Sequence, residues 1–99
     1  MKYATDNDQI IEVLTLTELC RFCETDDAWI VELVEHGALD PYDTSATEWE
    51  FHAFSIARAR KARRLQRDFE VNAAGIAVIL DLLEERDALR RALAVIEGG

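Results

Sequence analysis

The chain has 99 residues and a formal net charge of -9, from 11 Lys and Arg against 20 Asp and Glu. Apolar residues make up 49% and charged residues 31%, a balance typical of a folded globule and not of a disordered tail. The length predicts one domain over residues 1–99, and the negative charge disfavours free nucleic acid as a partner and favours basic surfaces.

The acidic residues are unevenly distributed along the chain. Residues 1–54 hold thirteen acids and only Lys2 and Arg21, a balance of -11, whereas residues 55–99 hold seven acids and nine bases, a balance of +2. This division predicts an acidic head followed by a weakly basic stalk. Residues 1–9 are polar and are expected to form a frayed terminus. They carry no signal-peptide pattern, and no apolar run is long enough for a membrane span, so a cytoplasmic location with reduced cysteines is expected.

Residues 10–16 are rich in apolar and β-branched side chains and predict a short strand. Thr17 is the expected N-cap of a short helix whose buried side holds Leu19, Cys20, and Phe22 or Cys23. A second helix is expected from a cap at Thr25 or Asp26 to Gly37, with Ile30, Leu33 and Val34 facing the core. Two helices separated by a tight break form the helix-turn-helix pattern, whose second helix normally enters the DNA major groove.

The charge of this second helix has the wrong sign for DNA. It carries Asp26, Asp27, Glu32 and Glu35, and neither lysine nor arginine occurs between residues 26 and 36. Contacts with DNA phosphates require cations. We therefore expect the motif to act as a scaffold for another partner, with Asp27, Val31, Glu32 and Glu35 outward and Trp29 at the flank.

Residues 39–51 predict a small two-stranded wing around a polar loop, leaning on the helices through Trp49 and Phe51. Residues 52–69 predict a third helix with Phe54, Ala62, Leu65 and Phe69 on its apolar side. Six of its residues from Arg58 to Arg67 are basic. They could neutralise nucleic-acid phosphates, but no base-reading residues lie among them, and we favour pairing with acids of the head or of a twin subunit.

Asn72 is the expected N-cap of a fourth helix that runs to about Ile96. Ile76, Ile79, Leu80 and Leu83 give its first half a core-facing stripe. Beyond this point the apolar residues follow a seven-residue step, which Arg86 interrupts. We expect a head over residues 11–69 and a dimerisation stalk over residues 72–97, with intramolecular packing of the stripe as the alternative. The residues expected to pair in a homodimer are Leu82, Leu89, Leu93 and Ile96.

Neither metal nor catalytic chemistry has a convincing pattern in the chain. Cys20 and Cys23 form a C-x-x-C pair, but His36 and His52 are isolated and lack the paired spacing of a zinc site. There is no nucleophile elbow, glycine-rich phosphate loop or Ser, His, Asp set in usable order. We expect neither an enzyme nor a bound cofactor or metal.

Several segments match a known family in order along the chain. They are Leu14-Thr15-Leu16-Thr17-Glu18-Leu19-Cys20, Glu32 followed by Gly37-Ala38-Leu39-Asp40-Pro41, Trp49-Glu50-Phe51, Ala62-Arg63-Arg64-Leu65, and Gly75-Ile76-Ala77-Val78-Ile79-Leu80. Together they resemble the chaperone-modulator family CbpM, a branch of the MerR-like winged helix-turn-helix superfamily. The resemblance implies a mainly α fold with a small β wing and a long C-terminal helix. In DNA-binding MerR proteins arginines occupy the positions of Ala28 and Val31.

Members of this family bind the J-domain of the co-chaperone CbpA and inhibit its work with the Hsp70 chaperone DnaK. The resemblance therefore implies an inhibitor of a CbpA/DnaJ-type co-chaperone that competes with Hsp70. The residues expected to contact the J-domain are Asp27, Trp29, Val31, Glu32 and Glu35. The alternative function is that of a small MerR-type DNA-binding transcription regulator.

Overall fold

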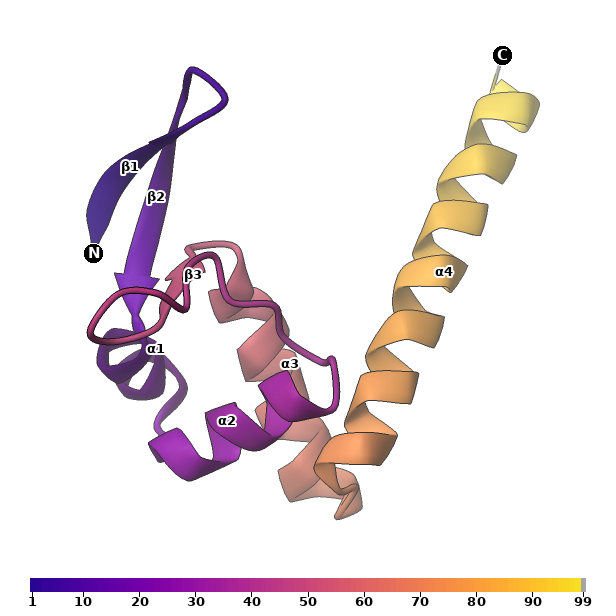
Figure 1. Cartoon of the computed structure of the whole chain (residues 1–99). Helices are drawn as coiled ribbons and strands as arrows, with labels where there is room; N and C mark the ends of the chain where they lie inside the picture. The colour runs from indigo at the N-terminus through magenta and orange to yellow at the C-terminus, as the bar shows by residue number, and fades with distance from the viewer. Residues whose placement is uncertain (99) are drawn as a thin grey trace.

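The computed structural model describes residues 1–98, which form three short strands and four helices around a small core (Figure 1). The antiparallel sheet has the order β1-β2-β3. This architecture confirms the predicted fold class, a mainly α chain with a small β component and a long last helix. The elements are β1 (Lys2–Asp6), β2 (Gln9–Thr15), α1 (Leu16–Cys23), α2 (Asp27–Glu35), β3 (Glu50–His52), α3 (Ser55–Phe69) and α4 (Ala73–Gly98).

The N-terminal residues form a strand, so the prediction of a frayed terminus at residues 1–9 is wrong. β1 pairs with β2 in register from Lys2↔Val13 to Asp6↔Gln9. Asn7 and Asp8 close the hairpin with φ angles of 52° and 64°, the positive values that a two-residue type I′ turn requires. The side chains of β1 are largely exposed, so its sequence lacks the alternation of apolar and polar residues that predicts a strand. Pairing with the backbone of β2 is what makes these residues a strand.

The predicted two-stranded wing also needs correction. Only Glu50–His52 forms a strand there, and it pairs with β2 through Leu14↔Phe51. The loop before it contributes a single bridge, Asp43↔Glu50. Phe51 is fully buried against the helices, as predicted. β2 already offers a free edge, so β3 extends that sheet instead of building a separate hairpin.

Helix α1 begins two residues before the position expected from a Thr17 cap. The Thr15 hydroxyl accepts a hydrogen bond from the Glu18 N–H at 3.1 Å, and the Thr15 N–H donates to the Glu18 carboxylate at 2.9 Å. This reciprocal pair is a capping box, which satisfies two free donors at the helix start. Thr17 lies inside the first turn, and its N–H donates to the Glu48 carboxylate at 2.7 Å.

Helix α3 begins at Ser55 and not at His52. Phe54 and Phe69, predicted on its apolar side, are 75% and 71% exposed. Leu65 packs against the core and Ala62 is buried, both as predicted, and the buried face consists of Ser55, Ala59 and Ala62. These small side chains let α3 pack closely against α1 and α4.

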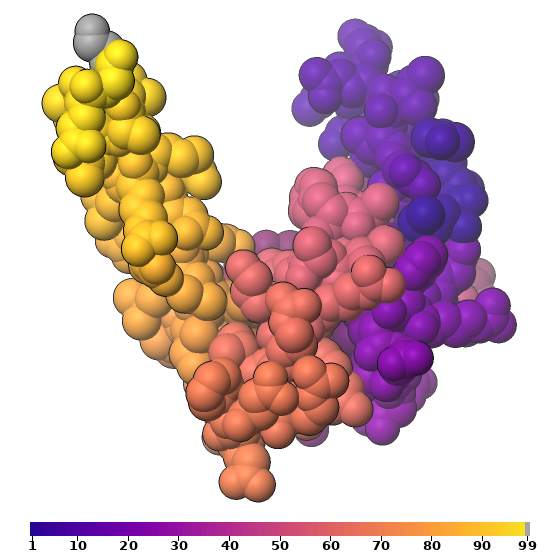
Figure 2. All heavy atoms as spheres, turned by 180° about the vertical axis from the view of Figure 1, so that it is seen from behind, coloured from indigo at the N-terminus to yellow at the C-terminus, as the bar shows by residue number. Residues whose placement is uncertain are grey.

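Helix α4 has a buried first half and a free second half. Asn72 accepts a hydrogen bond from the Gly75 N–H at 2.9 Å, as expected of an N-cap. Ile76, Ala77 and Leu80 lie in the core. Beyond Leu83 every described side chain is exposed, and this free half of α4 (residues 84–98) projects away from the head (Figures 1 and 2). None of the helices in residues 1–98 has the length and apolar composition needed to cross a membrane.

Candidate interaction surfaces

The helix-turn-helix is held by specific caps at each end of α2. Glu24 ends α1 in the left-handed conformation, with a φ of 53°. The Asp26 carboxylate then accepts a hydrogen bond from the Trp29 N–H at 2.9 Å and starts α2. After the helix, Gly37 has a φ of 77°, the left-handed conformation predicted for it, which favours glycine. These caps fix the orientation of α2 and therefore of its outward face.

The outward face of α2 carries the predicted carboxylates, and we call Asp27, Val31, Glu32 and Glu35 the acidic face. The three carboxylates are exposed and Val31 is half-buried. Ile30 and Leu33, on the opposite side of the helix, have no exposed surface and contact the core. The helix therefore presents negative charge around one apolar side chain.

Trp29 does not belong to this face. It lies in the core cluster with 9% of its surface exposed. The prediction that placed it at the flank as a partner contact is therefore corrected to a packing role. A large aromatic ring at the start of α2 gains more from burial than from a marginal surface position.

The carboxylates of the acidic face have no cationic partner within residues 1–98. Two bases of the chain pair with acids of other elements. Lys2 lies 2.6 Å from a Glu50 carboxylate oxygen, and Arg58 pairs with Asp81 at 3.1 Å and with Glu84. The negative charge of α2 is therefore not neutralised by an ion pair within residues 1–98.

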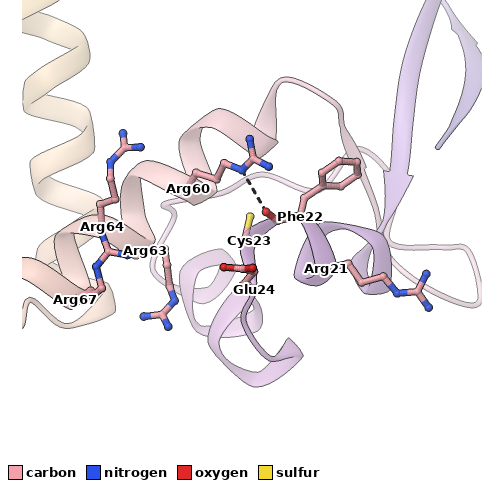
Figure 3. A pocket seen from close by; sticks show the side chains of 8 residues that line it. All are labelled: Arg21, Phe22, Cys23, Glu24, Arg60, Arg63, Arg64 and Arg67. Atoms are coloured by element: carbon pink, nitrogen blue, oxygen red, sulfur yellow. Dashed lines mark hydrogen bonds between the residues drawn. The ribbon is translucent and has the colours of Figure 1, made fainter.

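The basic residues of α3, which could neutralise nucleic-acid phosphates, form a second charged surface whose contact with α1 was not predicted. Phe22 and the C-terminal end of α1 lie beside α3 and complete a depression of about 610 Å³ (Figure 3). We call it the arginine groove; its lining residues are Arg21, Phe22, Cys23, Glu24, Arg60, Arg63, Arg64 and Arg67. Within residues 1–98 no ion pair joins this arginine run to the acids of residues 1–54, because Arg58 reaches α4 and Arg67 pairs with its neighbour Asp68, so that part of the prediction is wrong. Pairing with acids of a twin subunit stays a prediction.

The predicted dimerisation residues all lie on the exposed part of α4. Leu82, Leu89, Leu93 and Ile96 are between 53% and 77% exposed. Four large apolar side chains at heptad spacing on a free helix are typical of a helix-pairing seam. The burial of these residues by a second copy of the chain stays a prediction.

The two thiols are free, and burial raises the pKa of both Cys20 and Cys23 above the usual value. A raised pKa leaves the reactive thiolate less populated. In the part of the chain that the structure describes, no three His, Cys, Asp or Glu side chains gather in a metal-binding arrangement.

Comparison with known proteins identifies the family. The model of a family described as MerR HTH family regulatory protein matches residues 14–97. The chaperone modulatory protein CbpM of Coxiella burnetii (strain Dugway 5J108-111) is 40% identical over 68 residues, which are 69% of this chain and 64% of that protein. CbpM of Pseudomonas entomophila (strain L48) is 32% identical over 81 residues, which are 82% of this chain and 80% of that protein. The chain belongs to the CbpM family.

The membership confirms the resemblance drawn from the sequence motifs. CbpM of Salmonella paratyphi A (strain ATCC 9150 / SARB42) is 33% identical over a similar span. The match to the Coxiella protein covers a little under two thirds of its length. The family model is described as a regulatory protein and the relatives as chaperone modulators, and neither description names an enzyme.

Proposed function

We propose that this CbpM-family chain is a negative modulator of a DnaJ-like co-chaperone of the CbpA type, whose J-domain it binds through the acidic face of α2. The observation that carries the proposal is a helix-turn-helix whose second helix exposes three carboxylates and no base. Each of these carboxylates is exposed and lacks a cationic partner within residues 1–98.

The expected partner surface has complementary charge. J-domains present a basic helix next to a His-Pro-Asp loop, and both engage Hsp70. A carboxylate face covering that helix would exclude Hsp70 by competition. Opposite charges would raise the association rate, whereas contact through Val31 and its desolvated surroundings would set the lifetime of the complex.

The exposed apolar stripe of α4 supports a dimeric inhibitor. Leu82, Leu89, Leu93 and Ile96 would pair with the same residues of a second copy about a twofold axis. Each large apolar side chain buried in such a seam contributes roughly 1.5 to 3 kcal/mol. A dimer would present two acidic faces on one particle.

A DNA-binding transcription regulator is the second candidate function. It is favoured by the description of the matching family model and by the arginine groove. The charge of α2 opposes it, because a recognition helix that enters the major groove approaches two phosphate backbones. In this chain that helix would bring carboxylates against phosphates.

Charge reversal on α2 tests the proposal. The variant Asp27→Lys, Glu32→Lys, Glu35→Lys is titrated against an isolated J-domain by calorimetry at two salt concentrations. Asp6→Lys, Asp40→Lys, Glu70→Lys is the matched control, because it changes the net charge equally at exposed sites away from α2. We expect the α2 variant to bind at least about tenfold more weakly, since attraction is replaced by like-charge repulsion, and to lose inhibition of the J-domain-stimulated ATPase of Hsp70.

The control variant should keep affinity within a small factor of the wild type. An α2 variant that folds, as judged by circular dichroism, and binds with unchanged affinity and salt dependence would contradict the proposal. A duplex gel shift of the wild type that is abolished by Arg60→Glu, Arg63→Glu, Arg64→Glu would favour the regulator instead.

A further inference from the structure

The arginine groove concentrates positive charge in a strongly acidic protein. Its lining includes five arginines and one carboxylate, Glu24. Figure 3 shows Arg60 and Arg63 reaching from α3 on the side of α1, with Arg64 and Arg67 farther along the same helix and Arg21 on α1 at the outer rim. The chain as a whole carries a net charge of -9. Such local charge of the opposite sign needs either an internal or an external counter-charge.

Little of that counter-charge is internal. The Arg60 Nε donates to the Phe22 backbone oxygen at 3.2 Å, and Arg63 donates to the neutral side-chain oxygen of Gln66 at 3.2 Å. Within residues 1–98, the ion pair of Arg67 with Asp68, its immediate neighbour in the chain, is the only one that any of the five arginines makes. Most of the guanidinium donors are therefore free to bind anions.

We infer that the arginine groove binds an acidic segment of a second protein, separately from the acidic face of α2. Carboxylates of that segment would accept paired hydrogen bonds from the guanidinium groups, which favour bidentate contact with planar anions. An apolar side chain of the segment would contact Phe22, whose ring is 39% exposed and lies 6.0 Å from the Arg60 guanidinium carbon.

The spacing of the arginines fits a short extended peptide. Arg60 and Arg67 are seven residues apart on one helix, a rise of about 10 Å. In an extended chain, alternate side chains lie on one side at intervals of about 7 Å. Two or three acids in an alternating pattern therefore span the groove from α1 to the end of α3.

Two other occupants fit the surface less well. A nucleic acid presents phosphates continuously along its length, and beyond the groove it would meet Asp26 and Asp27, the N-cap and first residue of the acidic α2. The acidic face of a second copy would use the carboxylates proposed to bind the J-domain, and a head-to-tail contact of this kind builds a ring or an open filament. A short acidic segment of another protein avoids both problems.

Fluorescence anisotropy with the full chain tests this inference. The probe is a labelled ten-residue peptide with glutamate at alternate positions. The neutral control is the same peptide with glutamine in place of each glutamate. A single-stranded oligonucleotide with the same number of charges is the third probe. The groove variant is Arg63→Gln, Arg67→Gln, and its matched control is Arg90→Gln, Arg91→Gln, two exposed arginines on the free half of α4.

We expect the glutamate peptide to bind the wild type and the glutamine peptide not to bind. The groove variant should weaken binding by about tenfold or more, because hydrogen bonds to charged groups are the strongest polar contacts, and the control should stay within about twofold. Affinity for the J-domain should not change in the groove variant. If that variant does not fold, Arg63→Lys, Arg67→Lys keeps the charge, loses the bidentate geometry and should still bind more weakly.

Three results would overturn the inference. They are no binding of the glutamate peptide, equal losses in the groove and control variants, and tighter groove-dependent binding of the oligonucleotide. A decrease in sedimentation coefficient on mutating the groove would instead identify the occupant as a second copy, and would also overturn it.

Discussion

Glu18 links the first helix to the N-terminus. Its carboxylate contacts the Met1 ammonium and accepts a hydrogen bond from the Thr15 N–H. These contacts, the ammonium first, lower the pKa of Glu18 to about 2. The carboxylate therefore stays ionised in the folded protein under conditions that protonate it in the unfolded chain, where its pKa is about 4.3.

This difference predicts a pH-dependent effect of Glu18→Gln. A lowered pKa in the folded state stabilises the protein fully above pH 4.3, and the effect is lost as the pH falls toward 2. We expect Glu18→Gln to lower the free energy of unfolding by about 0.5 to 1 kcal/mol at pH 7, and by less than this at pH 3. Urea titrations at both pH values measure it. Glu12→Gln, at a carboxylate without a side-chain hydrogen bond in the described chain, is the matched control, and equal losses in the two variants at both pH values would contradict the prediction.

At the scale of the element, α2 combines two faces with different roles. Trp29, Ile30 and Leu33 point into the core and anchor the helix. Val31 lies half-buried among the outward carboxylates. Periodicity assigned Ile30, Leu33 and Val31 to the correct sides, but Trp29 was placed at the flank because its position lies between the two faces.

Alanine substitutions should separate these roles. Trp29→Ala removes a core aromatic side chain and is expected to lower the free energy of unfolding by about 3 to 5 kcal/mol. Val31→Ala should lower it by less than about 1.5 kcal/mol yet weaken binding to the J-domain several-fold, because it removes the half-buried apolar side chain of the acidic face. Denaturant titration and calorimetry measure the two effects. A Trp29 variant that is as stable as wild type but fails to bind would reverse the assignment.

At the scale of the whole molecule, the buried part of α4 attaches to the head and the free half stands in solvent (Figure 2). Leu89 and Leu93 are 65% and 53% exposed there. A long helix with apolar residues at heptad spacing gains little stability when it is alone in water. A partner helix would remove this surface from solvent.

The predicted dimer can be tested through this seam. Leu89→Glu, Leu93→Glu should raise the dimer dissociation constant by at least about 100-fold, because four large side chains per dimer lose their burial. Arg91→Glu, outside the stripe, serves as the control and should leave the dimer intact. Sedimentation velocity over a range of concentrations distinguishes the two. A wild-type chain that stays monomeric at high micromolar concentration would contradict the prediction.

The sequence by itself determined the features that are local or periodic. Apolar residues three and four apart placed the buried side of α2, Asp26 and Gly37 marked its ends, and Asn72 marked the start of α4. The sign of the charge on α2 is a property of residue types alone. The motifs that carry the CbpM resemblance are likewise contiguous segments.

Only the tertiary structure decided the features that depend on distant segments. β1 is a strand because β2 supplies its hydrogen bonds, and Glu50 and Phe51 join that same sheet instead of a separate wing. The start of α1 is a local feature by contrast, because Thr15 and Glu18 stand three residues apart in the capping-box pattern, which the sequence carries but the expected Thr17 cap overlooked. The arginine groove exists because folding brings Phe22 beside Arg60, 38 residues away. Contacts between segments far apart in the chain cannot be predicted from the sequence pattern of either segment, because each segment alone could pack against several other neighbours.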